Sequence, residues 1–237
     1  MADTKSRRTA NINVTEFHNF FQGWLVRQQH YLEELRSALR RCDESRDEDL
    51  RDLIARVLAH YQQYYEEKSR MANHDVSLVF SPPWFSPFEQ SFFWIAGFKP
   101  GLAFRILGGS VDDLSKEQTE RMEVLRSETK AEERELENEL ARIQESVAAP
   151  PIVQVARKEN LPVDGEYDTA DMESVMETLR GEMEVVLANA DMLRSRTAER
   201  LVEILTPFQN VRFLAAVTEL QLKIRMWGSQ IDAGRRR

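Results

Sequence analysis

The length and composition of the chain exclude several classes of protein. Its 237 residues can bury a large core, 42% of them are hydrophobic and 30% are charged, which excludes a disulfide-stapled miniprotein, a collagen and a disordered polymer. The longest uninterrupted apolar stretch, Phe92 to Phe98, has seven residues, whereas a helix needs about 20 to span a bilayer. We therefore expect no association with a membrane.

Charge and cysteine content bear on partners and compartment. Acidic residues outnumber basic ones by 40 to 32, a net charge of −8, which argues against broad binding to nucleic acid because phosphate binding requires concentrated positive charge. The one cysteine, Cys42, cannot form an internal disulfide, and no secretory signal is visible at the N-terminus. We therefore expect a reducing compartment, the cytoplasm or the nucleus.

Two amphipathic helices are predicted in the first third of the chain. Apolar residues recur in steps of three and four from Phe17 to Leu39 and again from Leu50 to Tyr65, with a charged turn at 40–45 between the two stripes. Long helices joined by a short loop form an antiparallel pair. Ahead of them, residues 1–14 are polar and basic, and we expect this segment to be disordered.

An aromatic segment then interrupts the helical pattern. Nine of the 21 aromatic residues lie between 80 and 104, which is too dense for a solvated linker. The sequence Ser-Pro-Phe-Glu at 86–89 is a capping box with proline at the first helical position, so a short helix is predicted over 87–96 and a further turn or two up to Gly108-Gly109. We interpret the aromatic residues of this segment as the core of an irregular cap. Alternatively, they form the wall of an apolar pocket or of a partner-binding groove.

Three further helices are predicted in the second half. A capping box at 115–118 opens a helix of some 30 residues whose one narrow apolar face indicates coiled-coil-like packing against a single partner helix, from this chain or from another copy. After a linker at 160–165, a helix restarts near Asp168, and its four methionines, at 172, 176, 183 and 192, are expected in the core. A third capping box at 206–209 opens the last helix, which is expected to end at Gly228 before a basic tail at 229–237.

These elements predict the fold class. No stretch alternates long enough to indicate a strand, so we expect an all-α protein. Its residues 15–228 would form a single-domain bundle of long amphipathic helices with a short, aromatic-rich helical insertion.

The sequence offers few groups that would support catalysis. The glycines fit neither phosphate-loop nor dinucleotide fingerprint, and the histidines lack the spacing of a zinc site. We expect His30 and His60 to be partly exposed, Glu132 and Glu133 to belong to a solvated face, and Cys42 to be an incidental surface thiol. The chain is therefore expected not to be an enzyme, with no catalytic, metal-binding or cofactor-binding residues.

Several motifs, in a specific order, connect the chain to a known family. The stretches 81–89, 94–100, 114–118, 143–146 and 190–207, followed by Trp227-Gly228, resemble the plant delay-of-germination domain, which is also the C-terminal half of TGA-type basic-leucine-zipper transcription factors. The resemblance covers roughly residues 15–228. It implies an all-helical regulatory domain associated with seed dormancy and abscisic acid signalling, with type 2C protein phosphatases or TGA-type factors as candidate partners.

The resemblance also bears on haem and DNA. Haem binding in the dormancy branch involves histidines of the final helix, but the corresponding segment, 220–227, carries Gln221, Arg225 and Met226 and no histidine, so we expect no haem bound through that helix. In TGA-type members the zipper precedes this domain. Only about 14 residues precede the first helix here, so no zipper is expected and direct DNA binding is doubtful; any DNA or nuclear-import contact would depend on Arg235–Arg237.

We hypothesise a non-enzymatic module that binds regulatory proteins in the nucleus and cytoplasm. Its expected contacts are Phe20 and Trp24 of the first helix and Trp84 and Phe85 of the aromatic entry, and homodimer formation stays open. One alternative is a transcription regulator that contacts DNA directly or through a zipper-bearing partner. Another is a sensor of an apolar small molecule, lipid or haem, with an aromatic and methionine-lined interior as its pocket.

Overall fold

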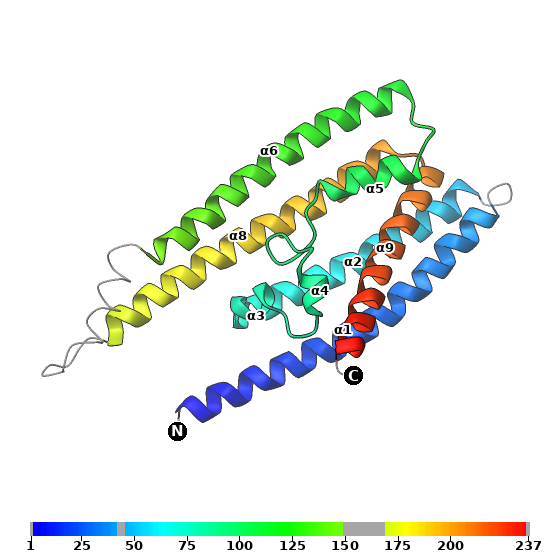
Figure 1. Ribbon diagram of the computed structural model, residues 1–237. Coiled ribbons are helices and arrows are strands. Elements are labelled where there is room, and N and C mark those ends of the chain that lie inside the picture. The colour runs from blue at the N-terminus through cyan, green and yellow to red at the C-terminus, as the bar shows by residue number, and fades with distance from the viewer. Residues whose placement is uncertain (1, 42–45, 149–168, 236–237) are drawn as a thin grey trace, which may run out of the picture.

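The computed structural model describes residues 2–41, 46–148 and 169–235. Within these ranges the chain forms eight α-helices and no strand, which confirms the predicted all-α fold (Figure 1). None of the described helices is both long and apolar enough to cross a membrane. In chain order the helices are α1 (Ala2–Arg40), α2 (Asp47–His74), α3 (Val76–Phe80), α4 (Pro87–Gln90), α5 (Leu102–Ser110), α6 (Lys116–Ser146), α8 (Thr169–Ile204) and α9 (Pro207–Arg235).

The bundle joins a three-helix unit to a long helical hairpin. Helices α1 and α2 form the predicted pair and α9 packs against both, while α6 and α8 run side by side (Figure 1). Helix α2 also contacts α8 and thereby connects the two parts. The single partner helix expected for α6 is thus α8 of the same chain.

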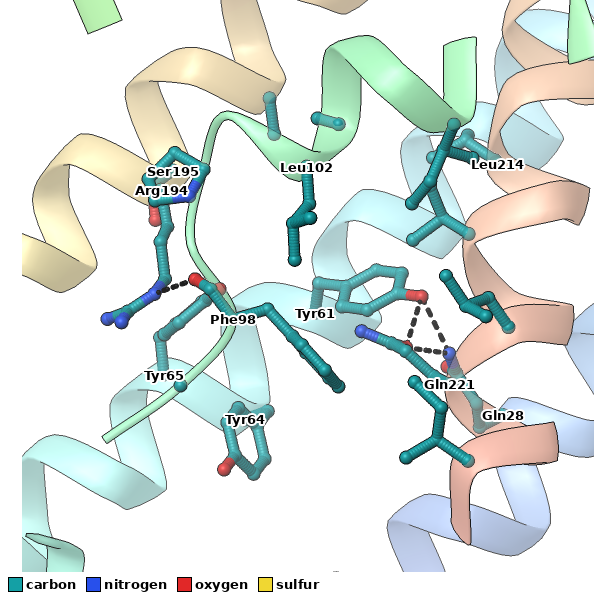
Figure 2. A pocket seen from close by; sticks show the side chains of 18 of the residues that line it. Gln28, Tyr61, Tyr64, Tyr65, Phe98, Leu102, Arg194, Ser195, Leu214 and Gln221 are labelled. Atoms are coloured by element: carbon teal, nitrogen blue, oxygen red, sulfur yellow. Dashed lines mark hydrogen bonds between the residues drawn. The ribbon is translucent and has the colours of Figure 1, made fainter. Parts of the chain in front are cut away.

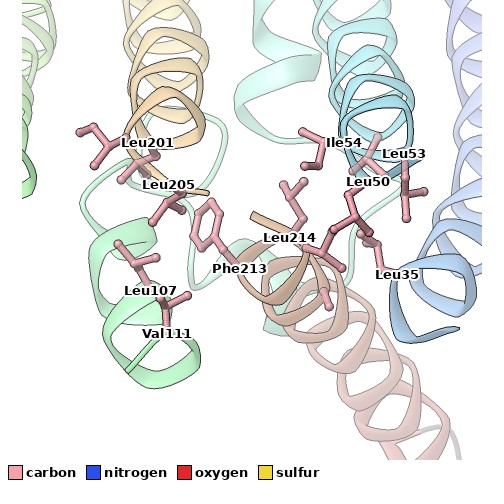
Figure 3. Packing of buried hydrophobic residues seen from close by; sticks show 14 of the residues in the cluster. Leu35, Leu50, Leu53, Ile54, Leu107, Val111, Leu201, Leu205, Phe213 and Leu214 are labelled. Carbon is pink, nitrogen blue, oxygen red and sulfur yellow. The ribbon is translucent and has the colours of Figure 1, made fainter. Parts of the chain in front are cut away.

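The largest apolar cluster lies where the hairpin meets the three-helix unit. Its buried side chains come from α1, α2, α5, α6, α8 and α9 and from the connections between them. Figure 3 shows Phe213 of α9 between Leu205, which directly follows α8, and Ile54 of α2. Burial of one such side chain contributes roughly 1.5–3 kcal/mol. This cluster fixes how α9 sits between the other helices, and α9 in turn carries much of the site described below.

The three predicted capping boxes are present. In the box at 86–89, the backbone N–H of Glu89 donates to Oγ of Ser86 at 3.2 Å, and the Ser86 N–H donates to the Glu89 carboxylate at 2.8 Å. The boxes at 115–118 and 206–209 show the same reciprocal pattern. Each box satisfies backbone donors that a helix leaves free at its N-terminus.

Two predicted helix limits at the ends of the chain are wrong. Helix α1 begins at Ala2, so the segment expected to be disordered is helical from residue 2. Helix α9 does not end at Gly228 but continues to Arg235, and most of the predicted basic tail is therefore helical. Glycine lowers helix propensity, but here it permits close packing, because Gly228 is buried against the cap of α4.

The short helix predicted over 87–96 ends at Gln90. Ile95 and Ala96 have φ angles of 44° and 55°, in the left-handed region that side chains with a Cβ rarely adopt and that no right-handed helix contains. Strain of this kind persists where surrounding contacts hold the backbone in place. The contacts that do so belong to the site described below.

Replacing Gly228 by alanine should destabilise the protein by about 1–3 kcal/mol, a typical cost of overpacking. A Cβ at this position would lie 2.1 Å from Oγ of Ser86, and that hydroxyl is held in the capping box of α4. Gly181→Ala in α8 is the matched control, since no atom lies within 4 Å of its added Cβ and helix propensity alone should stabilise it by up to about 1 kcal/mol. Urea denaturation should show a lower free energy of unfolding than the wild type for Gly228→Ala and a higher one for Gly181→Ala. Changes of the same sign in both variants would contradict the prediction.

Candidate functional site

An apolar cavity of about 870 Å³ lies between α1, α2, α5, α8 and α9 and the aromatic segment. Its volume is within the range of small-molecule sites, about 300–1,000 Å³. Aromatic side chains form much of the wall, among them Phe21, Tyr64, Phe93 and Phe98. The aromatic segment is thus partly a pocket wall, which was the alternative interpretation, and partly core.

The cavity reaches solvent. Three of the apolar residues that line it, Phe92, Leu102 and Leu220, are also exposed at the surface. They come from the segment after α4, from α5 and from α9. These residues mark an opening through which an apolar molecule could enter.

An uncharged polar group interrupts the apolar wall on the α9 side. The side-chain amide nitrogen of Gln28 donates to the Tyr61 hydroxyl at 2.7 Å and to Oε1 of Gln221 at 3.0 Å, and the Tyr61 hydroxyl donates to the same Oε1 at 2.8 Å (Figure 2). Burial raises the pKa of Tyr61 to about 12. The hydroxyl is therefore protonated at neutral pH, and the group carries no charge.

A buried ionic group lies on the α2–α8 side of the cavity. Nζ of Lys68 is 2.8 Å from Oδ1 of Asp191, and desolvation lowers the pKa of Lys68 to about 8 against the opposing effect of Asp191. The guanidinium of Arg194 also pairs with Asp191. Two cations thus share one carboxylate next to the cavity.

Arg194 also holds the strained loop in place. Its Nε donates to the carbonyl of Phe98 at 2.8 Å, and its Nη2 donates to the carbonyls of Ile95, at 2.9 Å, and of Trp94. These bonds satisfy carbonyls that no helix pairs and fix the left-handed residues. Because Gly97 and Phe98 line the cavity, Arg194 also determines the shape of its wall.

Two glutamates position the segments around the cavity. Buried Glu89 pairs with Arg225 at 3.1 Å, which ties α4 to α9. The sequence predicted a solvated Glu133, which is wrong. Its side chain is buried, and its Oε1 accepts a hydrogen bond from the backbone N–H of Gly101, at the start of α5, at 2.6 Å. The neighbouring Glu132 faces outward and pairs with Arg196 of α8.

The predicted partner-binding residues gather in one aromatic cluster. Trp24 and Trp84 are each only 6% exposed, and Phe20 and Phe85 are half-buried against the same cluster. Trp24 and Phe85 also line the cavity. Direct contact with a partner at these positions stays a prediction, and only Phe20 and Phe85 have surface to offer. Of the three terminal arginines, Arg235 is exposed, and Arg236 and Arg237 lie outside the described residues, as does Cys42.

The methionine-lined interior expected from the sequence is not observed. Met176 and Met192 are 49% and 59% exposed, while Met183 packs against the core. Residues 183 and 192 are nine positions apart, which at 3.6 residues per turn places them on opposite faces of α8. The side chain of Met172 lies outside the described residues, and no described methionine lines the cavity.

His60 is buried, contrary to the expectation of partial exposure. It is 2% exposed, and its ring stacks on Trp24 with 4.5 Å between centroids. Neither ring nitrogen has a hydrogen-bond partner in the described part of the chain, and desolvation lowers the pKa of His60 to about 4. His30, also expected to be partly exposed, is exposed and lies 3.2 Å from Glu34.

The burial of His60 predicts an acid-sensitive fold. The folded state keeps the imidazole neutral to about pH 4, whereas an unfolded histidine protonates near pH 6.5, so the unfolded state binds more protons between these values and falling pH favours unfolding. We expect the free energy of unfolding to fall by about 2 kcal/mol between pH 7.5 and pH 5. Urea titrations should show a smaller loss of unfolding free energy for His60→Phe than for the wild type; equal pH dependence of the two proteins would contradict this.

The residues near the final helix do not fit axial ligation of haem. Gln221 uses its amide oxygen within the uncharged group, and Arg225 is paired with Glu89. No histidine lines the cavity. Across residues 2–41, 46–148 and 169–235, no cluster of three or more His, Cys, Asp or Glu side chains could hold a metal ion.

The fold and the site define the class of protein: an all-helical domain with an internal apolar cavity. Comparison with known proteins gives its family. The family model described as seed dormancy control, DOG1, matches residues 31–108. Protein ZW2 of Arabidopsis thaliana is 37% identical over 90% of this chain and 96% of its own length. Protein RESPONSE TO ABA AND SALT 1 of the same plant is 38% identical over 88% of this chain and 93% of its own length.

Transcription factor TGA2.3 of Oryza sativa subsp. japonica is a more distant relative. It is 27% identical over 87% of this chain but only 61% of its own length. Together with the two Arabidopsis relatives, this match confirms the resemblance found in the sequence. The chain belongs to the DOG1 family, whose members named here point to a regulatory role in plants.

Proposed function

We propose that the protein is a non-enzymatic regulatory module that acts in the nucleus and cytoplasm by binding other regulatory proteins, in seed dormancy or abscisic acid signalling. The names of its relatives support the setting, since one denotes a response to abscisic acid (ABA) and salt and another a transcription factor. The candidate partners are type 2C protein phosphatases and TGA-type factors.

The observation that carries this proposal is an exposed apolar stripe on α9. Leu220, Trp227 and Ile231 are exposed, Trp227 by 42%, and their spacing of seven and four places them on one face of the helix. Exposed tryptophan is enriched among residues that dominate binding energy. This stripe is a stronger candidate for a partner contact than the buried Trp24 and Trp84.

The stripe is tested by binding to a purified type 2C phosphatase and a purified TGA-type factor, measured by calorimetry. Trp227→Ser should weaken binding at least tenfold, because removal of a central aromatic contact costs about 2 kcal/mol or more. Val124→Ser, an exposed apolar position on α6, is the matched control and should leave affinity unchanged. Equal affinities for Trp227→Ser and the wild type would reject the stripe, and separate Phe20→Ala and Phe85→Ala variants test the aromatic alternative.

Direct binding to DNA forms no part of this proposal. Arg235, Arg236 and Arg237 supply only three adjacent cations, and the net charge of the chain is −8, whereas a DNA-binding protein typically contacts about 6–10 phosphates. A gel shift at low salt should show no retardation of a DNA duplex by the protein alone. Retardation that is lost at higher salt would instead support the DNA-binding alternative.

The cavity supports a second candidate function, sensing of an apolar small molecule. Its volume, its apolar walls and its opening are those of a ligand site. Binding would alter the surroundings of Leu220, which belongs both to the opening and to the stripe. Native mass spectrometry of the purified protein tests for a co-purified ligand, and added hemin should give no Soret band, because no histidine faces the cavity.

A further inference from the structure

The amide of Gln221 presents one unpaired group to the cavity. Its Oε1 accepts hydrogen bonds from both Tyr61 and Gln28, at 2.8 and 3.0 Å. Because the amide oxygen is the acceptor in both bonds, Nε2 lies on the other side of the amide. Figure 2 shows Nε2 turned away from these bonds, toward the space beside Phe98. Both hydrogen bonds of this amide to described residues use Oε1 and none uses Nε2.

The uncharged group offers a ligand an accessible donor but no accessible acceptor. Oε1 of Gln221 already takes two bonds. Oε1 of Gln28 has no partner among the described residues, but it is buried away from solvent. The Tyr61 hydroxyl is used by Gln28, Gln221 and Thr218. A carbonyl oxygen, which only accepts, would therefore be fully satisfied beside Nε2, whereas the O–H of an alcohol would lack a partner there.

The cationic side chains that line the cavity are already engaged. Arg225 pairs with Glu89, and Arg194 uses its donors on three backbone carbonyls and Asp191. Lys68 donates to the same Asp191. An anionic ligand would have to compete for these cations at the α2–α8 side, while a neutral carbonyl at Gln221 displaces no existing bond.

We propose that the cavity binds an apolar molecule bearing an uncharged carbonyl group, a ketone, aldehyde or ester, whose oxygen accepts a hydrogen bond from Nε2 of Gln221. This inference rests on the second candidate function, that the cavity is a ligand site. The apolar remainder of the molecule lies against the aromatic wall formed by Phe98, Phe93 and Phe21. No covalent step is involved.

The test uses the full chain and the hydrocarbon probe 1,6-diphenylhexatriene, which fluoresces in apolar surroundings and has no polar group. Dodecane, 2-dodecanone and dodecanoate, matched in chain length, then compete with the probe. In the wild type we expect 2-dodecanone to bind about fivefold to tenfold more tightly than dodecane, the value of one net hydrogen bond. Dodecanoate is expected to bind more weakly than the ketone.

Two variants identify the donor. Gln221→Glu keeps an oxygen for Tyr61 and Gln28 but replaces Nε2 by a second oxygen, so the preference for the ketone over dodecane should disappear. Gln221→Met removes the whole amide at similar length and should give the same result while still binding the probe. Thermal melting of both variants verifies that they are folded.

The outcomes separate the inference from the function on which it rests. Failure of the probe and of all three ligands to bind would reject the ligand site and the inference together. Hydrocarbon binding without a ketone preference, or with the preference intact in Gln221→Glu, would overturn the inference alone. Tighter binding of dodecanoate than of 2-dodecanone in the wild type would also overturn it and would assign the polar end of the ligand to Lys68 and Arg194.

Discussion

Replacing Arg194 by methionine should destabilise the protein by about 3–5 kcal/mol, the range observed when one partner of a buried ion pair is removed. The side chain is 7% exposed. Its loss would leave the buried carbonyl of Ile95 without a donor and the carbonyl of Trp94 with only the Gly97 N–H, at 3.2 Å. Each unsatisfied buried group costs about 1–3 kcal/mol. The left-handed residues Ile95 and Ala96 would also lose the contacts that hold them.

Guanidinium denaturation followed by circular dichroism measures this effect. Arg200→Met is the matched control, because Arg200 pairs across the same hairpin with Glu128 but at the surface, where an ion pair contributes about 0–1 kcal/mol. In native buffer, binding of 1,6-diphenylhexatriene should be weakened in Arg194→Met and unchanged in Arg200→Met, since the loop that Arg194 holds forms part of the cavity wall. Similar stability of the two variants would refute the role assigned to Arg194.

The sequence predicted well what is local along the chain. The apolar stripes and the three capping boxes gave the order of the long helices, because a cap and a helix face depend on residues only three or four positions apart. Predictions failed where a distant contact decides. Gly228 was expected to end α9, but Ser86 packs on it from α4, and Glu133 was expected in water, but Gly101 of another segment donates to it.

From the sequence, only one segment of the candidate site could be predicted, and not the set of residues that form it. Aromatic density at 80–104 indicated either a core or a pocket wall, and the structure contains both. The polar group in the wall combines Gln28, Tyr61 and Gln221, which come from three helices and are 33 and 160 residues apart. No periodicity relates such positions. Arg194 likewise looked like any charged residue of a long helix. Its role is visible only in the structure, where it donates to the carbonyls of Trp94, Ile95 and Phe98.

Replacing Trp24 by alanine should destabilise the protein by about 3–5 kcal/mol, as for other buried tryptophans. The indole is 6% exposed and stacks on His60. Its Nε1 donates to the backbone carbonyl of His60 at 2.9 Å, which ties α1 to α2. Phe20→Ala on the same helix is the control: its half-buried ring should contribute less, about 1–2 kcal/mol.

The Trp24 variant also separates a core role from the partner contact that the sequence predicted for it. If Trp24 only holds α1 against α2, Trp24→Ala should lower the unfolding midpoint strongly but bind partner proteins with wild-type affinity at temperatures where circular dichroism shows it to be folded. Trp227→Ser should do the opposite, with a stability within about 0.5 kcal/mol of the wild type, as is usual for surface substitutions, and a weakened affinity. Loss of partner binding in folded Trp24→Ala would instead indicate that the partner contacts the aromatic cluster. That cluster would then have to open on binding, because the buried indole has almost no exposed surface.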